Sequence, residues 1–260
     1  MENINENNQW NEKQNVIAFS RGYNDITDRF GISQVGYILF KGTYNGRNAH
    51  LKVLDYGCGY GRFGRLFSDI DRRVIGVDTS QAAIDEAFFG NHLHYHSHLS
   101  LSFEKIESGK IPFIINNSLD GAVANFVFCT IQDDSEIIKI LKEIKRVIKP
   151  KSSLILCDPH PESIGKDYIS FKKEIAEPLH SGVKVQTTFS GIPNKFYDIW
   201  RSKEDYVSLL ERAGYFNIQI FEPIIEGEDR KDELFWKDER RYPPFLIIKA
   251  IKKQENEKSF

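Results

Sequence analysis

The sequence predicts an α/β fold in which a mostly parallel sheet is covered on both faces by helices. Short apolar runs that end in glycine or aspartate alternate with helical patterns, and two more apolar runs close the chain with no helix between them. Alternation of strand and helix is typical of a parallel sheet with helices on both faces. Two consecutive strands predict a hairpin-like antiparallel edge.

The expected strands are apolar runs of strand length bounded by glycine, proline or polar residues. They are KVLDYG (52–57), RRVIGVD (72–78), LDGAVANFVF (119–128), SSLILCD (152–158), NIQIFEPII (217–225) and PPFLIIKAIKK (243–253). Ligands of parallel sheets bind at the carboxyl ends of the strands. Asp55, Asp78, Asn125 and Asp158 lie at or near such ends, so they are candidate site residues.

The expected helices have apolar residues at intervals of three and four. They are VIAFSRGYNDITDRF (16–30), RFGRLFSDI (62–70), SQAAIDEAFF (80–89), SEIIKILKEIKRVIK (135–149) and SKEDYVSLLERAG (202–214). Ser80, Ser135 and Ser202 are suited to cap three helix starts, and Gly214 is suited to end the last helix. Residues 160–200 are aromatic-rich and are expected to be irregular.

Composition narrows the functional class. The chain has 260 residues, is 40% hydrophobic and carries a net charge of −2. We therefore expect one globular domain, and no nucleic-acid partner, because phosphate neutralisation needs an excess of basic residues. The polar N-terminus lacks the apolar core of a signal peptide, and no run is long enough to span a membrane. With three scattered cysteines, these features predict a cytoplasmic protein with reduced thiols and no membrane partner.

The loop LDYGCGYGRFG after the first strand has two interpretations. Gly59, Gly61 and Gly64 form G-x-G-x-x-G, which is typical of dinucleotide binding. Alternatively, Asp55 begins an acid-x-G-x-G-x-G pattern that continues through Gly57. In both interpretations the glycines let the backbone turn sharply and approach a ligand closely.

Asp55 discriminates between these interpretations, whereas Asp78 does not. A carboxylate at Asp78, after the second strand, suits the ribose of any adenosine cofactor. A carboxylate directly before the glycines would repel a pyrophosphate but would attract the sulfonium and ammonium groups of S-adenosylmethionine. The late position of the loop and the antiparallel C-terminal edge also disfavour a dinucleotide fold.

The sequence from about residue 16 to 252 resembles a class I S-adenosylmethionine-dependent methyltransferase of the small-molecule, type 11-like kind. The resembling motifs are VLDYGCGYGRFG, VIGVDTS, IPFIINNSLDGAVANFVFCTIQD, EIKRVIKPKSSLILCDPHP, RSKEDYVSLLERAGYFNIQIFEP and WKDERRYPPFLIIKAIKK. The resemblance implies a Rossmann-like three-layer sandwich with a seven-stranded, mostly parallel sheet whose last strand is antiparallel. It also implies an N-terminal helical lid and an insertion after strand five.

The resemblance implies a division of this single domain. Residues 1–45 would form the N-terminal tail and helical lid, 46–160 the cofactor-binding core, 161–200 the acceptor-side insertion, and 201–252 the C-terminal helix and strand pair.

By resemblance, Gly57, Cys58, Gly59 and Gly61 would line the methionine part of the cofactor, with Asp55 near its ammonium group. This is the set of residues that the loop itself supplies.

Other cofactor contacts come from the start of the helix after the loop and from the neighbouring strand ends. Arg62 would pair with the cofactor carboxylate, Asp78 would hold the ribose hydroxyls, and Thr79 would border the adenine. The family often has an acid after strand three to meet the adenine amine, and we expect His98 and Leu99 in that place here.

Three further contacts are implied, two of them beside the reactive methyl group. Asn125 and Phe126 would follow strand four beside that group, and Tyr23 would close over the cofactor as part of the lid.

His160, Asp158 and Tyr197 are the candidate catalytic residues. The motif DPHP ends strand five where an acceptor would sit, and His160 there is suited to remove a proton from an acceptor. Aromatic residues at high density, Tyr197 among them, predict a pocket wall for an apolar acceptor.

No metal and no thiol nucleophile are expected. The run HLHYHSH places four alternating histidines on one face of a strand, which is poor geometry for a tetrahedral site. Methyl transfer needs no covalent enzyme intermediate, and cysteines in apolar runs are usually structural.

The sequence thus predicts methyl transfer from S-adenosylmethionine to an O, N or C atom of a small, apolar or aromatic metabolite. A methyltransferase acting on RNA or another macromolecule is the first alternative. A dinucleotide-dependent oxidoreductase, or a protein that binds the cofactor without catalysis, comes next. The oligomeric state is not predicted.

Overall fold

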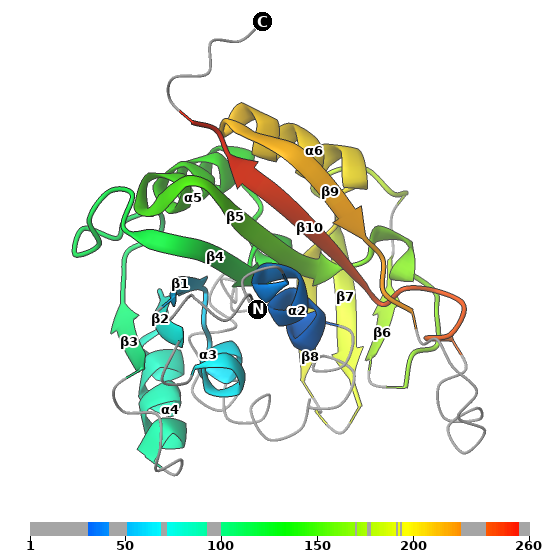
Figure 1. The fold of residues 1–260 in the computed structure, drawn as a ribbon. Helices are drawn as coiled ribbons and strands as arrows, with labels where there is room; N and C mark the ends of the chain where they lie inside the picture. The colour runs from blue at the N-terminus through cyan, green and yellow to red at the C-terminus, as the bar shows by residue number, and fades with distance from the viewer. Residues whose placement is uncertain are drawn as a thin grey trace, which may run out of the picture.

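The computed structural model describes residues 31–41, 51–68, 72–92, 100–169, 171–175, 178–190, 192, 194–224 and 238–254. Within these ranges the chain forms a seven-stranded sheet, a separate three-stranded sheet and helices on both faces of the large sheet (Figure 1). No helix among these residues has the length and apolar character needed to cross a membrane.

The large sheet has the strand order β3-β2-β1-β4-β5-β10-β9. Its strands are β1 (Leu51–Tyr56), β2 (Arg72–Asp78), β3 (Leu101–Lys105), β4 (Leu119–Asn125), β5 (Ile148–Pro159), β9 (Tyr215–Phe221) and β10 (Phe245–Lys252). All pairs from β3 to β5 are parallel, and β10 is antiparallel to both of its neighbours. The predicted mostly parallel sheet with an antiparallel last strand is therefore confirmed.

Helices cover both faces of this sheet. They are α2 (Ser33–Phe40), α3 (Arg62–Phe67), α4 (Gln81–His92), α5 (Asp134–Val147) and α6 (Lys203–Arg212), with short 3-10 turns η3 (Phe128–Thr130) and η4 (Pro161–Ser163). One apolar cluster joins the sheet to α5 and α6, and a second joins its other face to α2, α3 and α4. This gives the three layers that the resemblance implies.

Local sequence signals explain where several helices begin. The Ser80 hydroxyl accepts from the Ala83 amide at 3.2 Å, and Ser202 forms a capping box with Asp205, as expected. The expectation for Ser135 is wrong. Asp133 caps α5 instead, because its carboxylate accepts from the Ser135 amide at 2.8 Å.

Two short elements were not expected from the sequence. The strand β3, LSFEK, lies at the sheet edge and buries only alternate residues. The helix α2, SQVGYILF, buries Val35, Ile38 and Phe40 against the face that also carries α3 and α4. The expected helix at 16–30 lies outside the described residues.

The expectation that residues 160–200 are irregular is wrong. They contain β6 (Phe171–Glu174), β7 (Lys184–Phe189) and β8 (Lys195–Ile199), which pair in order as an antiparallel sheet. Figure 1 shows this small sheet beside the carboxyl ends of the strands of the large sheet.

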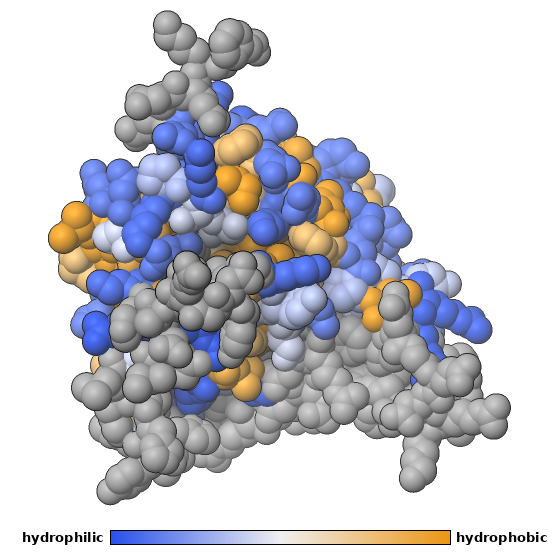
Figure 2. All heavy atoms as spheres, in the orientation of Figure 1, coloured by the Kyte–Doolittle hydropathy of each residue, from blue (hydrophilic) through white to orange (hydrophobic). Residues whose placement is uncertain are grey.

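The surface of the face shown in Figure 2 is mixed. Hydrophilic side chains predominate over the described residues there, with hydrophobic ones scattered between them. Phe216 and Ile220 of β9 are exposed apolar side chains, at 38% and 39% exposure, and such residues are common on protein surfaces.

Candidate active site

The glycine loop joins β1 to α3, and its backbone requires glycine. Gly57 and Gly59 have φ angles of 70° and 52°. A Cβ on Gly57 would lie 2.4 Å from Val127 Cγ2, whereas a Cβ on Gly59 would meet nothing within 4 Å. The amides of Gly57 and Cys58 both donate to the Val77 carbonyl, at 2.8 and 3.0 Å, and so fix the loop to β2.

Two carboxyl groups lie at the ends of adjacent strands beside this loop. Asp55 is only 2% exposed, and its Oδ2 has no hydrogen-bond partner among the described residues. Asp78 accepts from the amides of Gly59 and Ser80 at 2.9 and 2.8 Å. Burial, and then the charge of Asp78, raises the pKa of Asp55 to about 8. A buried, unpaired carboxyl group at a cavity is suited to a cationic ligand.

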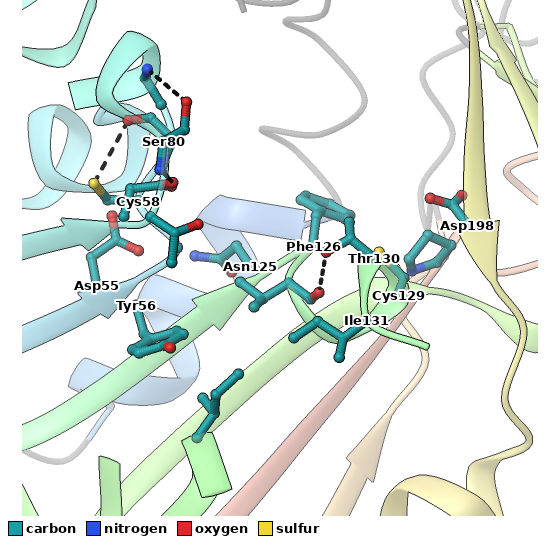
Figure 3. A pocket seen from close by; sticks show the side chains of 18 of the residues that line it. Asp55, Tyr56, Cys58, Ser80, Asn125, Phe126, Cys129, Thr130, Ile131 and Asp198 are labelled. Atoms are coloured by element: carbon teal, nitrogen blue, oxygen red, sulfur yellow. Dashed lines mark hydrogen bonds between the residues drawn. The ribbon is translucent and has the colours of Figure 1, made fainter. Parts of the chain in front are cut away.

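A cavity of about 750 Å³ opens at this edge of the sheet (Figure 3). It brings together nine of the predicted cofactor-binding residues: Asp55, Gly57, Cys58, Gly59, Arg62, Asp78, Thr79, Asn125 and Phe126. The carboxyl ends of β2, β1 and β4 lie side by side in the strand order, which explains why residues distant in sequence meet here.

The residues at the end of β4 are unusual in two respects. Both amide atoms of Asn125 are buried and have no partner in the described chain. Phe126 has a φ of 58°, and its amide donates to the Cys157 carbonyl at 2.6 Å. Its ring contacts Phe245 edge-on at 5.1 Å. A left-handed non-glycine residue next to an unpaired amide, both facing a cavity, is typical of a functional site.

The expected place for an adenine-facing acid needs correction. His98 and Leu99 were expected to follow strand three, but β3 begins only at Leu101, so they precede it. The residues that do follow β3 and line the cavity are 106–108, and they include Glu107. His98 and Leu99 themselves lie outside the described residues, as does Tyr23 of the expected lid.

Gly61 shapes the loop and does not line the cavity. Its φ is 81°, and it is the N-cap residue of α3. A Cβ there would lie 2.4 Å from Phe103 Cζ. The expected direct contact of Gly61 with a cofactor is therefore replaced by a role in turning the chain into α3.

His160 lies behind the cavity wall. Its side chain is 1% exposed, its Nε2 lies 2.7 Å from Glu222 Oε1, and its Nδ1 accepts from the Glu162 amide. Burial lowers the pKa of His160. We expected His160 to face an acceptor, but its ring is directed toward Glu222 and does not line the cavity.

The other two candidate catalytic residues are not on the cavity wall either. Asp158 is buried, and burial raises its pKa to about 7, partly offset by the neighbouring Cys129 and Tyr206. Tyr197 is on β8, where Asp198 lines the cavity. Successive strand residues point to opposite faces, so Tyr197 points away from the cavity.

The cysteines are buried thiols. Burial raises the pKa of Cys58, Cys129 and Cys157, so none is suited to act as a thiolate at neutral pH. Among the described residues no group of three or more potential ligands is arranged to hold a metal ion. Three histidines of the run HLHYHSH lie outside the described ranges.

The insertion sheet closes the far end of the cavity. Phe171 and Phe189 line it, as the aromatic composition predicts. Three polar lining residues were missed: Lys173, Thr187 and Asp198, one from each strand. Alternate residues of FKKE, KVQTTF and KFYDI point to the same face of the small sheet. This alternation could identify the three residues only once the segments are known to be strands.

Arg201 holds the segment after β4 against the insertion. Its guanidinium donates to the carbonyls of Phe128, Ile131 and Gln132 at 2.8–3.1 Å and pairs with Asp134 at 3.0 Å. The segment it holds lines the middle of the cavity.

Replacing Arg201 with alanine is expected to lower the free energy of unfolding by about 3 kcal/mol, because several buried carbonyls lose their donor. Urea denaturation measures this. Arg212, an exposed residue in the last turn of α6, provides the matched control. An Arg201→Ala protein as stable as Arg212→Ala would contradict the prediction.

The sheet order, the glycine-requiring loop and the unpaired acid before it make an α/β fold that is suited to a cationic adenosyl cofactor. Residues 47–214 match the family model described as a methyltransferase domain. The chain therefore belongs to this family and is a class I S-adenosylmethionine-dependent methyltransferase.

Individual relatives agree with this assignment. The chain is 28% identical over 173 residues to N-demethylindolmycin N-methyltransferase of Streptomyces griseus, covering 65% of this chain and 70% of that protein. The PH0226 protein of Pyrococcus horikoshii has a similar fold, with a TM-score of 0.63, 19% identity and coverage of 93% of this chain and 99% of that chain. A SAM-dependent methyltransferase from Aquifex aeolicus gives a TM-score of 0.58, 19% identity and coverage of 93% and 98%.

Proposed function

We propose that the protein transfers a methyl group from S-adenosylmethionine to an O, N or C atom of a small, apolar or aromatic metabolite. The observation that carries this proposal is the cavity, which continues from the glycine loop to a wall that includes Phe171, Phe189 and Phe245. Its volume of about 750 Å³ is within the usual range for small-molecule sites.

The residues at the loop end fit the cofactor. Asp55 has an unpaired oxygen that would meet the ammonium group, and Asp78, which also lines the cavity, would accept hydrogen bonds from the ribose hydroxyls. Thr79 and Glu107 would border the adenine. Arg62 would meet the cofactor carboxylate. The empty space beside Gly59 leaves room for the ligand to approach the backbone.

S-adenosylmethionine supplies a methyl group on a positively charged sulfur, which a lone pair of the acceptor displaces in line. The chain contributes alignment and exclusion of water. Asn125 and Phe126 lie between the loop and the insertion sheet, so they are placed to orient the two ligands relative to each other (Figure 3). A base is needed only where the acceptor must lose a proton.

The relative from Streptomyces griseus supports a small acceptor, because its name describes methylation of a small-molecule nitrogen. The net charge of −2 gives no support to a nucleic-acid acceptor.

Incubation with methyl-labelled cofactor and a panel of phenols, amines and carboxylic acids tests the proposal. We expect label in at least one small product by mass spectrometry, and none with the Asp78→Asn protein. Label that appears only in added RNA or protein would contradict a small-molecule acceptor.

A further inference from the structure

The wall of the cavity that faces away from the glycine loop carries a buried polar group built from three strands. Lys173 on β6, Thr187 on β7 and Asp198 on β8 all lie on the face of the insertion sheet that lines the cavity. Figure 3 places Asp198 beyond Phe126 and Cys129 as seen from Asp55. This group is therefore at the acceptor end.

The hydrogen bonds of this group leave one oxygen open. The Lys173 ammonium and the Thr187 hydroxyl both donate to Asp198 Oδ2, the latter at 2.7 Å, and Lys173 also lies 3.1 Å from Thr187 Oγ1. Lys173 is 5% and Asp198 14% exposed. Oδ1 of Asp198 makes no hydrogen bond to the part of the chain that the structure describes.

The charge of the cavity decides which acceptor suits this oxygen. Of the described residues that line it, six are acids and two are cations: Asp55, Asp78, Glu107, Asp133, Glu136 and Asp198, against Arg62 and Lys173. Arg62 belongs to the cofactor end, as do Asp55, Asp78 and Glu107. The remaining charged lining residues are Asp133, Glu136 and Asp198 against Lys173, and Lys173 is directed toward its two neighbours. An anionic acceptor would meet repulsion, whereas an ammonium or N–H group would meet a carboxylate oxygen.

We propose that Asp198 determines acceptor specificity by accepting a hydrogen bond from an amine. The acceptor is then an amine on an apolar or aromatic body, with that body against Phe171 and Phe189. Lys173 and Thr187 are positioning residues, because both bind Oδ2 and so leave Oδ1 for the acceptor. This inference rests on the proposed small-molecule function and names its substrate class.

Calorimetry on the complex with S-adenosylhomocysteine tests this, using matched amines, alcohols and carboxylic acids on phenyl, indolyl and cyclohexyl bodies. We expect amines to bind best and acids least. Asp198→Asn should weaken amine binding about tenfold, as loss of a charged hydrogen bond does, and leave S-adenosylhomocysteine affinity within about twofold of the wild type.

A double variant distinguishes loss of the hydrogen bond to the amine from a folding defect. Lys173→Met with Asp198→Asn removes both buried charges, so it avoids leaving an unpaired lysine. It should bind S-adenosylhomocysteine normally and still lack the preference for amines. Absence of amines among the binders, preference for acids, or an unchanged amine affinity in Asp198→Asn would overturn the inference. Failure of the wild type to bind S-adenosylhomocysteine would instead overturn the proposed function.

Discussion

Replacing Asp55 with asparagine is expected to weaken S-adenosylmethionine binding and, in the empty protein, to raise stability at about pH 8. The carboxyl group is buried without a partner for Oδ2, and its pKa is raised to about 8. Because the folded-state pKa lies above the unfolded one, the protonated form stabilises the fold fully below about pH 4, and this contribution is lost as the pH rises toward 8.

Urea denaturation at several pH values measures the stability effect. The wild type should lose stability between about pH 4 and 8, and Asp55→Asn should recover on the order of 3 kcal/mol at the upper end. Asp120→Asn is the matched control. Asp120 lies near the amino end of β4, at the other end of the strand from the cavity, and pairs with Lys149. Parallel pH profiles for wild type and Asp55→Asn would contradict the pKa assignment.

The same titration predicts a pH-dependent affinity. A cation that pairs with Asp55 favours the ionised form, so binding at pH 7 should release a proton and tighten as the pH approaches 8. Calorimetry in buffers of different ionisation enthalpy measures the number of protons that are released on binding. Asp55→Asn should bind at least about tenfold more weakly and release none.

Alanine at Gly57 should destabilise the protein by about 3 kcal/mol, against about 1 kcal/mol at Gly59. Both positions have a positive φ, but only at Gly57 would the new Cβ meet Val127, at 2.4 Å. Thermal denaturation compares the two variants. Adding Val127→Ala should restore part of the loss at Gly57, because it removes the clash while the backbone strain remains.

The loss of cofactor affinity should follow the opposite order, with the larger loss at Gly59. A Cβ at Gly59 would enter open space of the cavity, so Gly59→Ala should keep most of its stability and lose affinity for S-adenosylhomocysteine. Normal affinity in Gly59→Ala would show that the loop does not approach the ligand as proposed. Equal stability loss at both positions would contradict the predicted clash with Val127.

The cofactor-binding part of this fold was predictable because the sequence patterns that indicate it are local. The run KVLDYG, the glycines and the strand ending at Asp78 each depend on residues close in sequence, and the structure forms β1, the loop and β2 there. The final strand pair was predictable for the same reason. These elements also hold most of the cofactor-binding residues that were predicted.

The acceptor side was not predictable to the same degree. The strands β6, β7 and β8 are stabilised by pairing with one another, and their residues have no period strong enough to identify alone. The short edge strand β3 was missed, so the position after strand three was assigned to His98 and not to the residues that follow Lys105. Whether His160 faces the cavity or Glu222 depends on packing across the fold, which a motif does not contain.

Calorimetric titration of the purified protein with S-adenosylhomocysteine and, separately, with NAD and NADP tests the central claim most directly. That claim is that a buried acid before the glycine loop selects a sulfur nucleoside with a positively charged ammonium group over a pyrophosphate. We predict one-to-one binding of S-adenosylhomocysteine and no heat from either dinucleotide. Binding of NAD or NADP, abolished by substitution at Gly59, with no response to S-adenosylhomocysteine, would contradict it.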